Sequence, residues 1–223
     1  MSFHLSSGSF FIFARSLLHV LWPASCPVCG KLGESICASC LDGLAQMPIS
    51  VCLECGTGEP CALHPNGPYC RAVSRYDAVN RHVVHAMKYR NARRVATMMG
   101  QRIARSIAPP DADCLVPVPL HKGSERDYNQ ACLIAQGAGE VWGIPVRQVL
   151  AWHGNVSRQA RAGGAEERFL PKDAIIVSGN LSGCRRACLV DDVRTTGNTL
   201  CAARVALERE GCGVAGAVVW SMS

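Results

Sequence analysis

Apolar and polar positions in the second half of the chain follow two periods, one typical of strands and one typical of helices. Short apolar runs predict buried strands at 113–120, 145–150, 186–190 and 213–220. Apolar residues at helical spacing predict helices at 129–143 and 199–210. Strands that alternate with helices form a mostly parallel sheet covered by helices, so the sequence predicts an α/β fold. Such sheets bind ligands at the carboxyl ends of their strands.

A long helical pattern precedes this region and carries most of the positive charge. It predicts a basic helical segment over 80–108, which Pro109 ends because proline cannot donate to the helix. The apolar stripe of this segment is Val84, Met87, Val95, Met99, Ile103 and Ile107. Residues 71–107 carry a net charge of +8, whereas the whole chain carries +6. The segment is either a solvated helix face or a surface for single-stranded DNA or RNA, with Arg90, Arg93 and Arg94 as candidate contacts.

The first 22 residues are largely apolar but have neither the length nor the flanks of an exported segment. Arg15 interrupts the apolar run, no Lys or Arg precedes it, and its length is well short of the roughly 20 residues that span a bilayer. We expect an amphipathic leader helix over residues 1–22, with peripheral membrane contact as the alternative. We expect a cytoplasmic protein with no transmembrane segment.

Eight of the 14 cysteines lie between residues 26 and 70, and six of them form three C-x-x-C pairs. In a reducing compartment, two C-x-x-C pairs place four thiolates around one tetrahedral Zn²⁺ ion, and the predicted ligands are Cys26, Cys29, Cys37 and Cys40. A second set contains Cys52, Cys55 and Cys61, with either His64 or Cys70 as its fourth ligand. Closed sites of this kind are structural. The sequence therefore predicts a double zinc-ribbon module over residues 23–70, followed by the main domain over 71–223.

The stretch "CLVDDVRTTGNTL" (188–200) places two adjacent carboxylates, Asp191 and Asp192, at the end of a predicted strand. A hydroxyl-rich loop with Gly197 follows and opens a helix. The amino end of a helix has unpaired N–H groups that suit a phosphate, whereas carboxylates suit sugar hydroxyls or a divalent metal. The combination predicts a sugar-phosphate site.

This stretch resembles the 5-phosphoribosyl-1-pyrophosphate (PRPP) signature of type I phosphoribosyltransferases. The resemblance implies the type I phosphoribosyltransferase fold and a Mg²⁺-dependent PRPP site. It implies that Asp191 and Asp192 hold the ribose hydroxyls. The loop around the 5′-phosphate would then comprise Val193, Arg194, Thr195, Thr196, Gly197 and Thr199.

Three further segments resemble the ComF family: the paired cysteines, "HAMKY" (85–89), and "VPVPLHKGSERDYNQA" (116–131). The resemblance covers about Leu17 to Trp220 and implies a link to DNA uptake in competence, with other competence proteins as partners. Candidate pyrophosphate contacts are His121, Lys122 and Arg126, and a mobile lid is expected over 155–168. His153 and Glu166 are near enough in sequence to be candidates for a general base, but no catalytic residue and no acceptor is identified. A nucleic-acid-binding accessory module and a zinc-organised scaffold are the alternatives.

Overall fold

The computed structural model describes residues 25–34, 36–46, 48–89, 93–121, 124, 126–154, 170–171 and 173–223. The predicted leader helix (1–22) and the predicted lid (155–168) lie outside these residues. None of the helices in the described part of the chain has the length and apolar character needed to cross a membrane.

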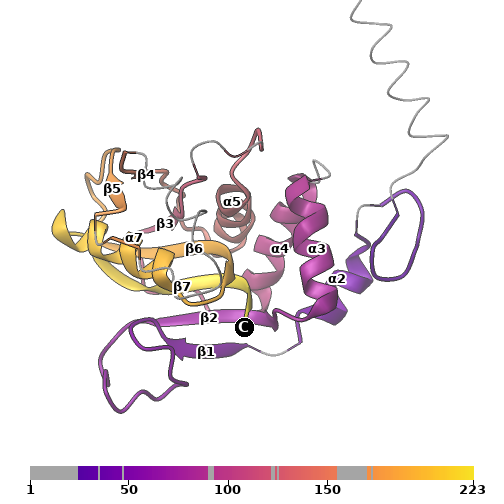
Figure 1. The fold of residues 1–223 in the computed structure, drawn as a ribbon, viewed down its shortest axis with the longest axis horizontal. Helices are drawn as coiled ribbons and strands as arrows, with labels where there is room; N and C mark the ends of the chain where they lie inside the picture. Colours follow the sequence, from indigo (N-terminus) through magenta and orange to yellow (C-terminus); the bar gives the residue numbers. More distant parts are fainter. Residues whose placement is uncertain are drawn as a thin grey trace, which may run out of the picture.

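A five-stranded sheet with the strand order β1-β2-β7-β6-β3 forms the centre of the molecule (Figure 1). Its strands are β1 (Ile49–Cys52), β2 (Tyr69–Arg75), β7 (Gly213–Met222), β6 (Arg186–Arg194) and β3 (Cys114–Pro117). Strands β2, β7, β6 and β3 are parallel, and only β1 is antiparallel to its neighbour. The predicted mostly parallel α/β sheet is therefore confirmed. Strand β2 crosses residue 70, the predicted boundary between the ribbon module and the main domain.

In the described part of the chain, five helices and a small two-stranded sheet surround the central sheet. The helices are α2 (Ala38–Leu44), α3 (Ala78–Tyr89), α4 (Arg93–Ser106), α5 (Gln130–Trp142) and α7 (Asn198–Arg209). The small sheet pairs β4 (Leu150–Trp152) with β5 (Ile175–Val177). Asn129 caps α5 by accepting a hydrogen bond from the Ala131 backbone N–H, and Gly143 ends the helix with φ of 70°.

Two predicted elements differ from the structure. The basic segment 80–108 is two helices, α3 and α4, rather than one. All six residues of its apolar stripe are buried in one cluster, so a single continuous period arises from two helices that share a core. The strand predicted at 145–150 is also largely absent: Val146 forms one parallel bridge to Leu115, and β4 begins only at Leu150.

The two ribbons pack into different hydrophobic cores. One core holds the apolar residues of α3, α4 and α5 together with Cys26, Ile36 and Leu41 of the first ribbon. The other holds the apolar residues of α7, β4 and β5 together with Leu53 of the second ribbon. Figure 1 shows α2 beside α3 and α4, whereas α7, β4 and β5 lie together at a different part of the sheet. The module predicted as one unit is thus divided between both cores.

Outside the ribbons, Cys114 and Cys184 form a disulfide with an S–S distance of 2.15 Å. The bond joins the start of β3 to the chain just ahead of β6. The Asp113 carboxylate accepts backbone N–H bonds from Arg185 and Arg186, both at 2.9 Å, at the same place. The cysteine spacing does not predict this pairing.

Helices α4 and α5 approach closely through glycines, and filling one is expected to destabilise the protein. A Cβ atom on Gly137 would overlap the carbonyl oxygen of Thr97, and one on Gly100 would overlap that of Ile134. We expect Gly137→Ala to cost about 3 kcal/mol by forcing the helices apart, which would lower Tm by about 10 °C in calorimetry. Gly43→Ala in α2 is the control, because its Cβ would meet no atom within 4 Å. Equal Tm values for the two variants would contradict this packing.

Candidate functional site

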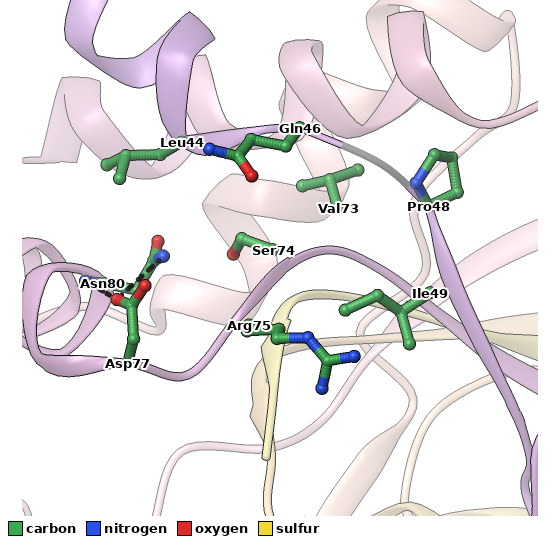
Figure 2. A pocket seen from close by; sticks show the side chains of 9 residues that line it. All are labelled: Leu44, Gln46, Pro48, Ile49, Val73, Ser74, Arg75, Asp77 and Asn80. Carbon is green, nitrogen blue, oxygen red and sulfur yellow. Dashed lines mark hydrogen bonds between the residues drawn. The ribbon is translucent and has the colours of Figure 1, made fainter.

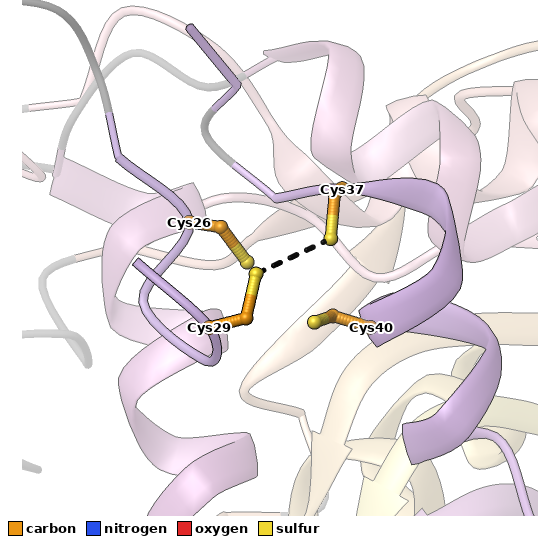
Figure 3. Close-up of side chains that lie close together, drawn as sticks. All are labelled: Cys26, Cys29, Cys37 and Cys40. Carbon is orange, nitrogen blue, oxygen red and sulfur yellow. Dashed lines mark hydrogen bonds between the residues drawn. The ribbon is translucent and has the colours of Figure 1, made fainter. Parts of the chain in front are cut away.

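The first ribbon brings four sulfur atoms together around one point (Figure 3). Cys26 and Cys29 lie on a tight turn that the Gly30 N–H closes by donating to the Cys26 carbonyl, and Cys37 and Cys40 lie at the start of α2. All four Sγ atoms lie within 4.8 Å of one another. A hydrogen bond from the Ser39 hydroxyl lowers the pKa of the Cys37 thiol to about 6, which favours the thiolate that binds metal. This geometry suits a closed tetrahedral zinc site.

The second ribbon forms an equivalent group from Cys52, Cys55, Cys61 and His64, again within 4.8 Å. His64 Nδ1 lies 3.6 Å from Cys52 Sγ and 3.7 Å from Cys61 Sγ. Cys70, the alternative fourth ligand, is outside this group: it is fully buried in β2, and burial raises its pKa to about 12. The structure thus gathers His64, not Cys70, with the three thiols.

The second ribbon contacts helix α7 directly. The backbone carbonyl of Leu53 accepts a hydrogen bond from Cys201 Sγ at 3.1 Å. The neighbouring Glu54 forms an ion pair with Arg204, which is mostly buried. Leu53 itself is fully buried. Because α7 begins at the predicted phosphate loop, the second ribbon supports the helix that carries this loop.

Arg194 connects the second ribbon to the predicted phosphate loop. Its side chain is 7% exposed, and its guanidinium lies against two glycines. A Cβ on Gly56 would be 3.0 Å from Nη2, and a Cβ on Gly197 would be 3.1 Å from Nε. Both glycines have positive φ, 76° and 84°. A side chain at either position would therefore be strained and would also press on the guanidinium.

The two adjacent carboxylates occupy the carboxyl end of β6, and their side chains leave opposite sides of the strand. Asp192 forms an ion pair with the Lys88 ammonium of α3, with Nζ 2.5 Å from Oδ2. Asp191 Oδ1 accepts a hydrogen bond from the Asp192 backbone N–H at 2.8 Å. Burial and then the charge of Asp192 raise the pKa of Asp191 well above its ordinary value of 3.8. Two carboxylates share this site with one ammonium, so the site favours a further cation or hydrogen-bond donors.

The raised pKa of Asp191 predicts that this carboxyl destabilises the ligand-free protein as pH rises. The folded state holds the Asp191 proton more tightly than the unfolded chain does. The stability that this protonated carboxyl contributes is therefore full below pH 3.8 and is lost as pH rises toward the folded pKa. We therefore expect Asp191→Asn to unfold at higher denaturant concentration than the unmodified protein at pH 8, with the advantage shrinking toward pH 4. Denaturation curves measured across this range test the prediction. An advantage that does not depend on pH would contradict it.

The predicted phosphate loop follows directly and leads into α7. Thr195 and Thr196 are exposed, and Gly197 occupies the N-cap position of α7, where it has no side chain to cap the helix. The Asn198 N–H donates to Thr196 Oγ1 at 3.4 Å. The threonine hydroxyls of the loop thus lie next to the amino end of α7. This arrangement suits an anion.

The loop after β3 lies beside this site, because β3 pairs with β6. His121 stacks on Trp152 with the ring centroids 4.0 Å apart, and Arg126 Nε donates to Ser124 Oγ at 3.0 Å. The Tyr128 hydroxyl donates to the Met87 carbonyl, which joins this loop to the end of α3 that carries Lys88. Lys122 lies outside the described residues.

Three side chains on or next to these two loops carry buried polar atoms without a hydrogen-bond partner among the described residues: Arg126 Nη1, Gln130 Oε1 and Arg194 Nε. Native proteins pair nearly all buried polar atoms, so such atoms indicate groups that a ligand or water completes. Gln130 was not predicted as a site residue. Its position in the "NQA" segment, directly after the helix cap, was the available signal.

The candidate nucleic-acid contacts differ from one another. Arg93 already pairs with Asp127 at 2.6 Å, and its guanidinium lies 5.0 Å from the centre of the Tyr128 ring. Arg94 is exposed and lines a groove of about 390 Å³ between α2 and α4, and Arg90 lies outside the described residues. The groove also contains Arg102, Arg105 and one carboxylate, Asp42, which pairs with Arg102.

No general base emerges from the described residues. His153 Nδ1 lies 3.8 Å from Asp173 Oδ2, and both side chains are more than half exposed. Glu166, the other residue near enough in sequence to be considered, lies outside the described residues.

Comparison with known proteins identifies the amino-terminal part of the chain. A double zinc ribbon domain matches residues 17–74. Together with the two four-ligand groups, the match supports structural Zn²⁺ and confirms the predicted zinc-ribbon module. A search of curated proteins finds no match to the chain.

Proposed function

We propose that the protein binds Mg²⁺-PRPP at the carboxyl ends of β3 and β6 and transfers its phosphoribosyl group, as a type I phosphoribosyltransferase of the ComF type. The unpartnered buried atoms on Arg126, Gln130 and Arg194 carry this proposal, because Arg194 ends β6, the strand of the acidic pair, and the other two follow β3, which pairs with β6. The resemblance of residues 188–200 to the PRPP signature agrees with it.

Each part of PRPP has a group of matching chemistry in this arrangement. Asp191 and Asp192 accept hydrogen bonds from the ribose hydroxyls, and the loop of Thr195, Thr196, Gly197 and Thr199 surrounds the 5′-phosphate at the amino end of α7. His121 and Arg126 lie on the loop that holds the pyrophosphate. The carboxylates and the ligand's phosphates suit Mg²⁺, which prefers oxygen ligands and supplies charge neutralisation to the leaving pyrophosphate.

Ligand-induced stabilisation tests this proposal. A ligand that binds only the folded state stabilises it by about 2.7 kcal/mol at a hundred times its Kd. We expect PRPP with Mg²⁺ to raise Tm by several degrees in scanning calorimetry and expect ribose alone to have no effect. No shift at millimolar PRPP would refute the proposal.

In a ComF-like setting the protein acts in the cytoplasm, where DNA taken up in competence arrives as single strands.

A second candidate function, single-stranded DNA binding, is favoured by the groove between α2 and α4. It combines Arg94, Arg102 and Arg105 with the single acid Asp42, and it adjoins the first zinc ribbon. Arginines that neutralise phosphates release the counterions bound there, so the affinity should fall as the salt concentration rises.

Replacing two of these arginines tests the groove. We expect Arg94→Gln/Arg105→Gln to weaken oligothymidylate binding and to reduce the slope of log affinity against log salt by about 1.4. Arg185→Gln, an exposed arginine on the chain leading into β6, is the control. An unchanged slope in the double variant would show that these charges belong to a solvated face. Fluorescence anisotropy over a salt series provides the measurement.

A further inference from the structure

The two ends of the central sheet carry different chemistry. The acidic pair and the phosphate loop lie at the carboxyl ends of its strands, as does a cavity of about 490 Å³ that Val73 and Arg75 of β2 help to line (Figure 2). The amino ends of β3, β6 and β7 instead bring three cysteines together, which are Cys114, Cys184 and Cys212. This group of three shares no residue with the zinc-ligand groups or with the candidate site.

The strand order gives Cys184 the central place in this group. Cys114 begins β3, Cys184 lies just ahead of β6, and Cys212 directly precedes β7. Because β6 pairs with β3 on one side and with β7 on the other, Cys184 lies between the other two cysteines. It is bonded to Cys114, and its Sγ atom lies 3.8 Å from Cys212 Sγ. Cys184 thus has one sulfur neighbour on each side.

The surrounding structure holds the third thiol against the disulfide. All three cysteines are buried in the same hydrophobic core. The Cys184 N–H donates to the Leu181 carbonyl at 2.8 Å, and the Gly213 N–H donates to the Arg185 carbonyl at 2.9 Å. These bonds fix the chain at Cys184 and beside Cys212. A thiol from solution reaches the disulfide only when the protein opens, whereas Cys212 is already in place.

The zinc ribbons indicate that the Cys114–Cys184 bond is reversible. The two ligand groups contain four and three cysteines, and all of these must stay reduced to bind Zn²⁺ as thiolates. Compartments that keep thiols reduced also reduce most disulfides, and those that form there are usually transient or redox-sensing. A disulfide in the same chain is therefore expected to form and break rather than to act as a permanent crosslink.

We propose that Cys114, Cys184 and Cys212 form a thiol–disulfide exchange site in which Cys184 changes its partner. The Cys212 thiolate attacks Cys184 Sγ, so that a Cys184–Cys212 bond forms and the Cys114–Cys184 bond breaks. Cys114 leaves as a thiolate and takes up the proton that Cys212 gives up, so the exchange needs no outside oxidant or reductant. The first disulfide forms when two thiols pass two electrons and two protons to glutathione disulfide, which becomes two molecules of glutathione.

The exchange moves the covalent link from one element to another. Strand β3 is an end strand of the sheet, and beyond its pairing with β6 it has one bridge, from Leu115 to Val146. With Cys184 bonded to Cys114, the link holds β3 to the start of β6. With Cys184 bonded to Cys212, the link holds the chain after α7 instead. Because β3 leads into the loop of His121, the exchange releases the strand that carries this loop.

Disulfide mapping of the zinc-loaded protein tests this proposal. Trypsin places the three cysteines on separate peptides, which begin at Ser106, Asp173 and Glu210 and contain no other cysteine. The protein is equilibrated in a glutathione redox buffer, quenched with acid, blocked with N-ethylmaleimide and digested without reduction. We expect mass spectrometry to find the Asp173 peptide linked to the Ser106 peptide in some chains and to the Glu210 peptide in others.

Single serine variants distinguish exchange from a fixed disulfide. Cys114→Ser should form the Cys184–Cys212 link in most chains, and Cys212→Ser should form the Cys114–Cys184 link alone. Cys132→Ser, a change at a buried cysteine of α5 outside the group, is the control and should keep both links in the proportions of the unmodified protein. If Cys212 carries maleimide in every chain of the unmodified protein or of Cys114→Ser, the pairing is fixed and the proposal is wrong.

Hydrogen exchange measures the effect of the link on β3. Oxidised Cys114→Ser carries the link to Cys212, whereas oxidised Cys212→Ser carries the link to β3. We expect the amides of β3 to exchange about tenfold faster in oxidised Cys114→Ser, and we expect this difference to vanish when both variants are reduced. Equal rates in the two oxidised variants would show that the link does not restrain β3 and would overturn the release of this strand.

Discussion

Cys52→Ser/Cys55→Ser is expected to leave one zinc ion per chain and to abolish PRPP binding. The remaining Cys61 and His64 cannot complete a tetrahedral site, and structural zinc contributes about 10 kcal/mol or more to the folding of such modules. Without it the contacts of Leu53, Glu54 and Gly56 with α7 and Arg194 are lost. Because these contacts support the helix that begins at the phosphate loop, the loop loses its geometry.

The first ribbon provides the matched control. Cys26→Ser/Cys29→Ser should also leave one zinc ion, but the described residues of this ribbon share a core with α3, α4 and α5, whereas those of α7 belong to the other core. The Cys26→Ser/Cys29→Ser change is expected to lower Tm, while the folded protein still binds PRPP. Atomic absorption for zinc and equilibrium dialysis for PRPP measure both effects. Equal PRPP binding by the two double variants would refute the role of the second ribbon.

A single substitution tests the contact between Gly56 and Arg194 without removing a zinc ligand. Gly56→Val should retain both zinc ions, because all eight ligands are unchanged. Its side chain would meet the Arg194 guanidinium and would be strained at φ of 76°, so PRPP affinity should fall. Unchanged affinity in this variant would place the effect of the second ribbon elsewhere.

Asp191→Asn/Asp192→Asn is expected to weaken Mg²⁺-PRPP binding by about a thousandfold. Each carboxylate would lose a charge-assisted hydrogen bond, worth about 2 kcal/mol, and two such losses give this factor. The amides keep the size of the side chains, so the fold should persist. Equilibrium dialysis measures the affinity, and Asp173→Asn, an exposed carboxylate, is the control. Equal PRPP binding by the double variant and the Asp173→Asn control would show that the acidic pair is not part of the PRPP site.

The sequence predicted the elements whose signals are local. The strand–loop–helix of residues 186–209 follows from an apolar run, a glycine and a helical period, and β6 and α7 lie there. The two ligand groups of the ribbons follow from cysteine spacing, because the second residue of each C-x-x-C pair must face the same ion as the first. Periodicity also identified the buried residues of α3 and α4 without showing that the helices are separate.

The sequence could not predict features that depend on distant pairing. Strand β1 is defined by its pairing with β2, and β2 by its place beside β7 near the carboxyl terminus. The Cys114–Cys184 disulfide joins residues 70 apart, so spacing gave no signal. Likewise, Lys88 and Asp192 meet only through the packing of α3 against the site. The contact between Gly56 and Arg194 joins positions far apart in the chain, so no local sequence pattern predicts it.

Isothermal titration of the zinc-loaded protein with PRPP, with and without Mg²⁺, tests the central claim most directly. The acidic pair, the phosphate loop and the unpartnered groups of Arg126 and Gln130 predict saturable binding of one PRPP per chain that requires Mg²⁺. Absence of heat and of saturation under both conditions would contradict a PRPP site. The hydroxyls and the helix amino end of the phosphate loop would then have to serve another anion, and the arginine groove between α2 and α4 would become the first site to examine.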